Sequence, residues 1–296
     1  MAKCYYTRTY YDHDLGIEES YKCPDEEYSE GLCKFHLKGY SADRKNQEEL
    51  IELLKQKIVY ANASESPLKW IGYQIPPEFA IMYEFKTNVY VDAANFMGNV
   101  SFSRSIFNKT ASFSNATFNQ EADFSTVMFN KTASFSNATF NQEADFSNTT
   151  FNEKADFSTA TFNQALFLAT TFNEKPVFSN TTFNEKADFS TATFNRKVNF
   201  SNATFNQEAN FLGTTFNREA DFSNTTFNEK ADFSTAMFNI EAYFYSATFN
   251  QEVLFFGTIF NQALFLGTTF NRGADFSTAT FNQEANFLGT IFNRQI

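Results

Sequence analysis

The sequence predicts an all-β solenoid, a rod built from one short unit stacked on itself, and three observations support this. Phenylalanine recurs at alternating steps of five and six residues from Phe96 to Phe292. A small residue, usually Ala, stands two positions before most of these phenylalanines. The remaining positions hold mostly Asn, Ser, Thr, Glu and Asp. A short period kept over about two-thirds of a chain is typical of stacked repeats.

Within the repeat, the spacing predicts short strands. A small residue and a phenylalanine two positions apart, such as Ala187 and Phe189, point to the same side of an extended chain. Asp188 between them is then expected to face water. An α-helix does not fit, because steps of five and six residues rotate by about 500° and 600° and scatter the phenylalanines around it. We expect Phe189→Ala to be costly and Asp188→Ala to be nearly neutral.

The two half-units of the repeat differ in the residue that follows the phenylalanine. After every second phenylalanine this residue is Asn, from Asn108 to Asn293, and in the other class it is usually Ser. A column of stacked Asn side chains can hydrogen-bond along the stack. We therefore interpret these asparagines as a structural ladder and not as a binding site.

The repeat resembles that of the pentapeptide-repeat family, whose unit is Ala-(Asp/Asn)-(Leu/Phe)-x-x. Ala122-Asp123-Phe124 and Ala285-Asn286-Phe287 match this unit directly. The resemblance covers residues 85–296 and implies a right-handed, quadrilateral parallel β-helix. One extra residue in every second unit departs from the family pattern, gives about 22 residues per coil, and is expected at a corner. Nine to ten coils would make a rod about 45 Å long.

Upstream of the repeat, we expect two small parts that form an α-containing cap. Residues 1–42 contain all the cysteines and histidines, and residues 43–84 contain a helix and an irregular connector. The helix is predicted over 46–60, with Asn46 and Glu49 as a capping box. Its apolar face is formed by four residues at helical spacing: Leu50, Leu53, Leu54 and Ile58.

A candidate metal site lies in residues 1–42. Cys4, Cys23, Cys33 and His36 make a Cys3His set, the composition of a closed structural zinc site. Some pentapeptide-repeat proteins have a similar N-terminal Cys…Cys…Cys-x-x-His module, so the resemblance also implies zinc. Three unrelated thiols are the alternative, because the spacing matches no standard zinc finger. His13 is expected at the surface, although it is an alternative ligand.

Composition argues against several classes of function. The net charge is −11 and the pI is about 4.8, so a nucleic-acid-binding surface is not expected. The sequence contains no phosphate-binding glycine loop and no histidine after His36, so we do not expect an enzyme. No signal peptide and no run of about 18 apolar residues occurs, so we expect a cytoplasmic protein without a membrane span.

Candidate interface residues lie where the repeat breaks its own rule. Apolar residues replace polar ones beside several phenylalanines, and if they face outward they form one exposed patch. Local burial at a rearranged corner is the alternative. The chain also ends in repeat at 291–296, with no polar cap. The candidate residues are Tyr243, Tyr245, Leu254, Phe256, Leu264, Leu266, Leu288 and Phe292.

These features predict a structural or protein-interaction scaffold that self-associates through its uncapped C-terminal end, as a dimer or a filament. Another protein is a second possible partner. The resemblance offers an alternative, because some pentapeptide-repeat proteins mimic DNA and bind DNA gyrase or a related topoisomerase. Against this, Lys154, Lys186 and Lys230 interrupt the acidic face.

Overall fold

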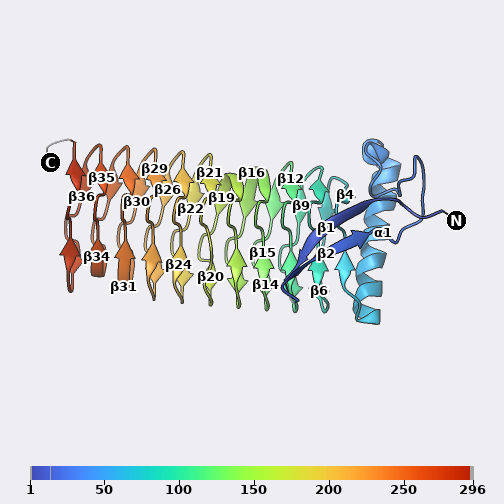
Figure 1. The fold of residues 1–296 in the computed structure, drawn as a ribbon, viewed down its shortest axis with the longest axis horizontal. Helices are drawn as coiled ribbons and strands as arrows, with labels where there is room; N and C mark the ends of the chain where they lie inside the picture. Colours follow the sequence, from blue (N-terminus) through green and yellow to red (C-terminus); the bar gives the residue numbers. More distant parts are fainter. Residues whose placement is uncertain (1, 14, 294–296) are drawn as a thin grey trace.

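The computed structural model describes residues 2–13 and 15–293, and it shows a long rod with a cap at its N-terminal end (Figure 1). The rod is a parallel β-solenoid of about ten coils. Parallel partners lie 21 or 22 residues apart, as for Phe107 and Phe129. Each coil has four short sides, which we number 1 to 4 in chain order. The predicted all-β solenoid is confirmed.

Sides 1 and 2 form two of the four walls, and some of their strands continue from one side to the next. Side 1 comprises β6 (Glu84–Phe85), β10 (Ile106–Phe107), β14 (Met128–Phe129), β17 (Thr150–Phe151), β20 (Thr171–Phe172), β23 (Thr193–Phe194), β27 (Thr215–Phe216), β31 (Met237–Tyr243), β34 (Ile259–Leu264) and β37 (Thr280–Phe281). Side 2 comprises β3 (Leu68–Lys69), β7 (Val89–Tyr90), β11 (Ala111–Ser112), β15 (Ala133–Ser134), β18 (Ala155–Asp156), β24 (Val198–Asn199), β28 (Ala220–Asp221), the ends of β31 and β34, and β38 (Ala285–Asn286).

Sides 3 and 4 repeat this arrangement across the coil. Side 3 comprises β4 (Gln74–Ile75), β8 (Asn95–Phe96), β12 (Thr117–Phe118), β16 (Thr139–Asp145), β19 (Thr161–Leu166), β21 (Thr182–Phe183), β25 (Thr204–Phe205), β29 (Thr226–Phe227), β32 (Thr248–Phe249), β35 (Thr269–Phe270) and β39 (Ile291–Phe292). Side 4 comprises β5 (Phe79–Ala80), β9 (Val100–Ser101), β13 (Ala122–Asp123), the ends of β16 and β19, β22 (Ala187–Asp188), β26 (Ala209–Asn210), β30 (Ala231–Asp232), β33 (Val253–Leu254) and β36 (Ala274–Asp275).

The core is a set of stacked phenylalanine columns, one for each side. Phe189 packs in parallel with Phe167 and Phe211, with ring centroids 4.8 and 5.0 Å apart. It also meets Phe178 and Phe200 edge-on, at 5.4 Å in both cases. Stacked and edge-on rings are both favourable arrangements of aromatic quadrupoles. The inward assignment of the phenylalanines is therefore confirmed.

The turn that follows sides 2 and 4 has a left-handed residue in each coil. In Phe113-Ser114-Asn115-Ala116, Ala116 N donates to Phe113 O (3.1 Å) and Asn115 has φ = 59°. A type II turn requires this conformation at its third residue, and Asn or Gly adopts it most easily. The recurring Ser-Asn and Leu-Gly pairs of the sequence therefore have a backbone reason.

The extra residue of every second unit lies at the corner between sides 1 and 2, or between sides 3 and 4. The register of β16 against β19 shifts between Phe140 and Glu143, where β19 is one residue shorter. β31 and β34 show the same shift between Phe238 and Glu241. The corner absorbs the extra residue without turning the inward positions out, as predicted.

The Asn residues form hydrogen-bonded ladders on sides 1 and 3, which confirms that prediction. On side 1, Asn130 Nδ2 donates to Asn108 Oδ1 and Asn152 Nδ2 donates to Asn130 Oδ1, each over 2.9 Å. On side 3, Asn228 Nδ2 donates to Asn206 Oδ1 over 2.9 Å. The ladders satisfy these amide groups inside the protein.

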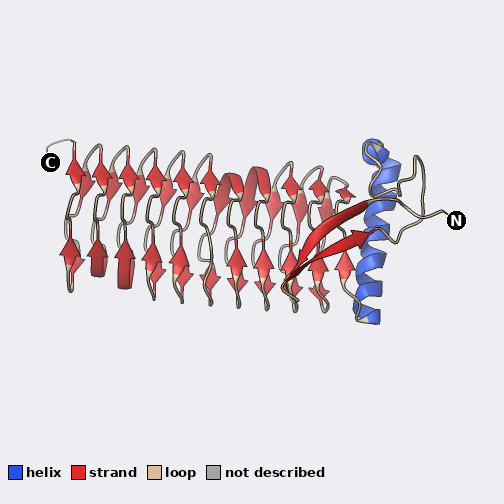
Figure 2. Cartoon of the chain, viewed as in Figure 1, coloured by secondary structure: helices blue, strands red, loops and turns tan. Residues whose placement is uncertain are grey.

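The cap consists of a hairpin, a loop and one helix, and it covers the N-terminal end of the rod (Figure 2). β1 (Thr7–Asp12) pairs with β2 (Ile17–Lys22) in antiparallel fashion. η1 (Tyr40–Ala42) precedes α1 (Arg44–Ser64). α1 buries Leu50, Leu54, Ile58 and Ala61 against the rod and the hairpin, whereas Leu53 is half-buried.

Two details of the cap differ from the sequence expectations. The N-cap of α1 is Asp43, whose carboxylate accepts from Asn46 N (2.9 Å), so the expected capping box at Asn46 is wrong. The parallel pairing starts at Leu68, which pairs with Val89, and so precedes the expected boundary at residue 85. Trp70 and Ile75 take inward positions in this first coil, where later coils have phenylalanine.

Candidate functional site

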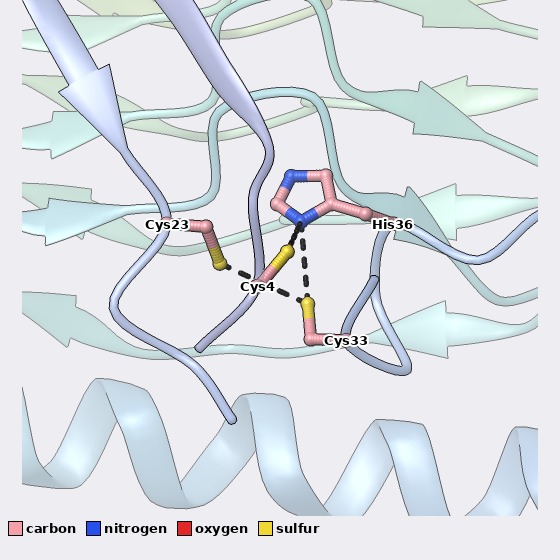
Figure 3. A group of neighbouring side chains, drawn as sticks. All are labelled: Cys4, Cys23, Cys33 and His36. Atoms are coloured by element: carbon pink, nitrogen blue, oxygen red, sulfur yellow. Dashed lines mark hydrogen bonds between the residues drawn. The ribbon is translucent and has the colours of Figure 1, made fainter. Parts of the chain in front are cut away.

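The four candidate metal ligands come together beneath the hairpin (Figure 3). Cys4 precedes β1 and Cys23 follows β2, so the pairing of the two strands brings them close. Cys33 and His36 share one tight turn, in which His36 N and Leu37 N both donate to Cys33 O (3.1 and 3.0 Å). All four side chains are buried.

The spacing of the four ligand atoms fits a tetrahedral metal ion. All of them lie within 4.8 Å of one another. Cys23 Sγ is 3.8 Å from Cys33 Sγ, and His36 Nδ1 is 3.2 Å from Cys33 Sγ and 3.6 Å from Cys4 Sγ. Tetrahedral zinc would place two sulfurs about 3.8 Å apart and a sulfur and a nitrogen about 3.6 Å apart. The residues present therefore fit this group.

The second nitrogen of His36 fixes the orientation of the ring. His36 Nε2 lies 3.0 Å from Ile71 O, and a carbonyl oxygen can only accept, so Nε2 carries the proton. Nδ1 then presents its lone pair to the three sulfurs. Tyr6 stacks on the imidazole with ring centroids 3.8 Å apart and holds it in place.

The thiols need a positive charge among them before they can all ionise. The contact with Cys33 and burial both raise the pKa of Cys23. Two neighbouring buried thiolates repel each other, and a bound cation removes this cost. In the described residues the three thiols are free, and none is part of a disulfide.

Asp25 joins the cluster to the helix and the first coil. Its Oδ2 lies 3.6 Å from Cys23 Sγ and accepts from Tyr73 OH, and its Oδ1 pairs with Lys57 Nζ at 2.6 Å. Burial alone would raise the pKa of Asp25, but the Lys57 charge and the hydrogen bonds outweigh burial and lower it. Its place two residues after Cys23 was the one signal in the sequence for this role.

His13 lies outside this group. Its ring is half-buried and packs edge-on against Tyr11, with ring centroids 5.0 Å apart. The four atoms that converge in the described residues belong to Cys4, Cys23, Cys33 and His36.

The structure divides the expected apolar patch between two opposite sides of the rod. Tyr243 and Leu264 pair on side 2, and Tyr245, Leu266 and Leu288 follow them in the adjoining turns. We call these five residues the side-2 patch. Leu254 lies on side 4, and Phe256, 47 % exposed, follows it. Sequence positions 11 apart are half a coil apart, so the eight residues do not form one surface.

The last described coil is uncovered. Phe287 and Phe292 are 36 % and 42 % exposed, whereas Phe189 in the middle of the rod is fully buried. Leu288 and Ile291 are also exposed, at 73 % and 51 %. This end of the described chain therefore presents apolar side chains and the open edges of β37, β38 and β39. Residues 294–296 lie outside the described residues.

The acidic residues of the rod are less solvated than we expected. Asp156 and Asp188 are half-buried, and each accepts from the amide and the hydroxyl of the Ser two residues later. These bonds, with nearby Lys154 and Lys186, lower the pKa of both carboxyls although burial opposes this. The two carboxylates stabilise their turns. They lie in equivalent environments, whereas general acid–base catalysis requires two carboxyl groups in different environments.

The fold and the buried Cys3His cluster define a parallel β-solenoid with a capped N-terminal end. A family model described as pentapeptide repeats (9 copies) matches residues 92–139, 124–171, 167–215 and 178–226. Residues 92–226 of this chain therefore have the repeat of the pentapeptide-repeat family. The match does not extend to the N-terminal cap, and no curated protein and no solved structure matches the chain. Among the described residues no helix has the length and apolarity of a membrane span.

Proposed function

We propose that this protein is a non-enzymatic scaffold, a rigid rod that self-associates through the last described coil. The observation that carries the proposal is the exposure of Phe287, Leu288, Ile291 and Phe292, in a rod whose core phenylalanines from Phe85 to Phe270 are buried. Open strand edges beside them offer backbone groups for pairing. The occupant we favour is a second copy of this chain, because its own last coil has the same edges and the same apolar side chains.

Sedimentation velocity over a range of concentrations tests this proposal. We expect a species of twice the 33.9 kDa chain mass, or filaments in electron micrographs of the same sample. Leu288→Lys should raise the protein concentration needed for self-association at least tenfold. Leu168→Lys is the matched control, because Leu168 is an exposed leucine in the middle of the rod. A wild-type protein that stays monomeric at all concentrations would contradict the proposal.

We also propose that Cys4, Cys23, Cys33 and His36 bind one structural zinc ion. Zinc would supply the positive charge that four inward ligands need, and with four protein ligands no position stays open for a substrate. His36 would bind through Nδ1, held by Ile71 O and Tyr6. A thiolate site of this kind suits a reducing compartment such as the cytoplasm.

Metal analysis of the purified full chain tests the zinc site. We expect one zinc per chain, its loss in Cys33→Ala, and no change in the control His13→Ala. Bound metal should also block reaction of the three thiols with a thiol reagent. A chain without metal whose three thiols all react freely would refute the site.

DNA mimicry is the weaker alternative. Lys154, Lys186 and Lys230 each pair with the Asp two residues later, at 2.9 to 3.3 Å, which neutralises part of each acidic column. A continuous negative surface is what a DNA mimic requires. Inhibition of DNA gyrase supercoiling at nanomolar protein would favour this alternative.

A further inference from the structure

An open groove of about 1000 Å³ lies between the hairpin, α1 and the first coil. One wall is a face of α1 that includes Leu53, Lys57 and Ala61, and the other is the end of β2. Its floor contains Phe35, Trp70 and Tyr73. Figure 1 shows the hairpin extending from the helix across the first coils. Cys33 of the metal site also lines the groove, whereas the proposed self-association does not use it.

β2 presents a free strand edge to the groove. In the described chain β2 pairs only with β1. Cys23 N donates to Tyr6 O (3.0 Å), and hydrogen-bonded pairs alternate along an antiparallel ladder. Ser20 and Lys22, which lie opposite Thr9 and Thr7, are therefore in non-hydrogen-bonded pairs. Their backbone N–H and C=O groups therefore point away from β1, and both residues line the groove.

One buried donor on the groove has no acceptor among the described residues. It is the indole N–H of Trp70, whose side chain is 1 % exposed. Buried polar groups are nearly always hydrogen-bonded, so an unpaired donor at a cavity wall indicates a missing acceptor. A peptide carbonyl is an acceptor of the required kind.

The charges of the groove indicate a neutral ligand. Lys57 pairs with Asp25, and Lys34 pairs with Glu49, so the cations of the helix wall are compensated inside the protein. Lys57 also lies over the Phe35 and Tyr73 rings, at 5.4 and 5.9 Å from the centroids. The lining also includes Lys22, Lys69, Glu26 and Glu27, so its four lysines and four carboxylates balance, and more of its exposed lining is apolar than polar. This complements an uncharged, apolar segment better than an anion or a cation.

We propose that this groove binds an extended, apolar peptide segment of another protein, which adds to β2 as a third strand. Backbone pairing with Ser20 and Lys22 would supply the affinity. Every second side chain of the peptide would point towards the rod, beside Tyr21, Leu53 and Trp70. The scaffold would then hold its partner at the capped end and leave the opposite end free.

The test uses the full-length protein and a random 12-residue peptide library displayed on phage. Enriched peptides are synthesised with a fluorescent label and titrated by anisotropy. We expect enrichment of sequences with apolar residues at alternate positions. Trp70 is the single tryptophan of the chain, so its fluorescence should change when unlabelled peptide binds. No enrichment over an uncoated surface would overturn the proposal.

Two proline variants separate strand addition from other binding. Ser20→Pro removes an N–H on the free edge of β2 without removing a bond to β1, and we expect at least a tenfold loss of affinity. Thr9→Pro removes the equivalent N–H on the outer edge of β1 and should change affinity less than twofold. Equal affinity of both variants would overturn the proposal.

A change in the peptide gives a test that does not depend on folding of the variants. Two peptide series would be N-methylated, one at the odd-numbered residues and one at the even-numbered residues. One series should lose affinity at least tenfold and the other should keep it, because only one set of amides faces β2. Trp70→Phe should weaken binding severalfold while it keeps an aromatic floor. Equal binding of both methylated series would contradict strand addition.

Discussion

The rod and the cap maintain their folds in different ways. In the rod, the contacts of Phe189 with its six neighbouring rings recur at almost every coil. In the cap, Asp25 contacts Cys23, Lys57 and Tyr73. In the rod, the free energy of unfolding is a sum of similar contributions from each coil and its neighbours. In the cap, by contrast, the contacts are not repeated. Single substitutions should therefore act locally in the rod and more widely in the cap.

The largest expected effect comes from truncating a ring in the middle of the rod. Phe189→Ala should cost about 3–5 kcal/mol, because it leaves a cavity in a fully buried column. Phe292→Ala should cost less than about 1 kcal/mol, since Phe292 is 42 % exposed. Urea unfolding and hydrogen exchange would measure both. Equal costs at the two positions would contradict the view that only interior coils are packed on both sides.

The second prediction concerns Asp92, where the cap meets the rod. Burial raises its pKa to about 7, and among the described residues only one of its side-chain oxygens has a partner, the Ser112 hydroxyl at 2.8 Å. Arg8 and Asp12 of the hairpin face it, and their charges act in opposite directions. Between about pH 4 and 7 the carboxyl is ionised only in the unfolded state, so stability should fall as pH rises through this range and stay lower above it.

Asp92→Asn should remove this pH dependence. The gain over wild type should grow from near zero at pH 4 to as much as about 4 kcal/mol at pH 8. Melting temperatures across this pH range would show a flatter profile for the variant. A profile parallel to that of wild type would mean that Asp92 is not the group responsible.

A smaller effect is expected at the turns of the rod. Asp188→Ala removes the acceptor of two Ser190 bonds, over 2.9 and 2.6 Å, and should cost about 1 kcal/mol. This corrects our sequence-based expectation of a nearly neutral change. Glu185→Ala, at an exposed carboxylate of the same coil, is the control and should change stability by less than about 0.5 kcal/mol. Equal effects would mean that the Asp–Ser bond contributes nothing.

The fold of the rod could be predicted because phenylalanine recurs at one inward position on almost every side of the coils. The first coil could not, because Trp70 and Ile75 replace phenylalanine there and hide the period. The position of the patch residues could have been predicted. Tyr243 and Leu254 are 11 residues apart, which is half of a 22-residue coil, so they had to lie on opposite sides.

The sequence was enough to predict the candidate metal site of the three cysteines and His36, because few residue types serve as zinc ligands. The role of Asp25 was not, since Lys57 and Tyr73 are 32 and 48 residues away and meet it only after α1 and the first coil have packed. The groove could not be predicted either, because whether a strand has a free edge depends on which other strands lie beside it in the folded protein.

Because the two half-coils are nearly identical, the number of inserted half-coils determines both the axial position and the rotation of all later coils. Inserting 22 residues would move everything beyond that point about 4.8 Å along the axis and keep its orientation. Inserting 11 would move it about half as far and turn it by half a revolution, with the phenylalanines still inward. The side-2 patch would then lie in line with side 4 of the coils before the insertion. A change in the number of repeats thus changes both the distance between the two ends of the molecule and their relative rotation about the rod axis.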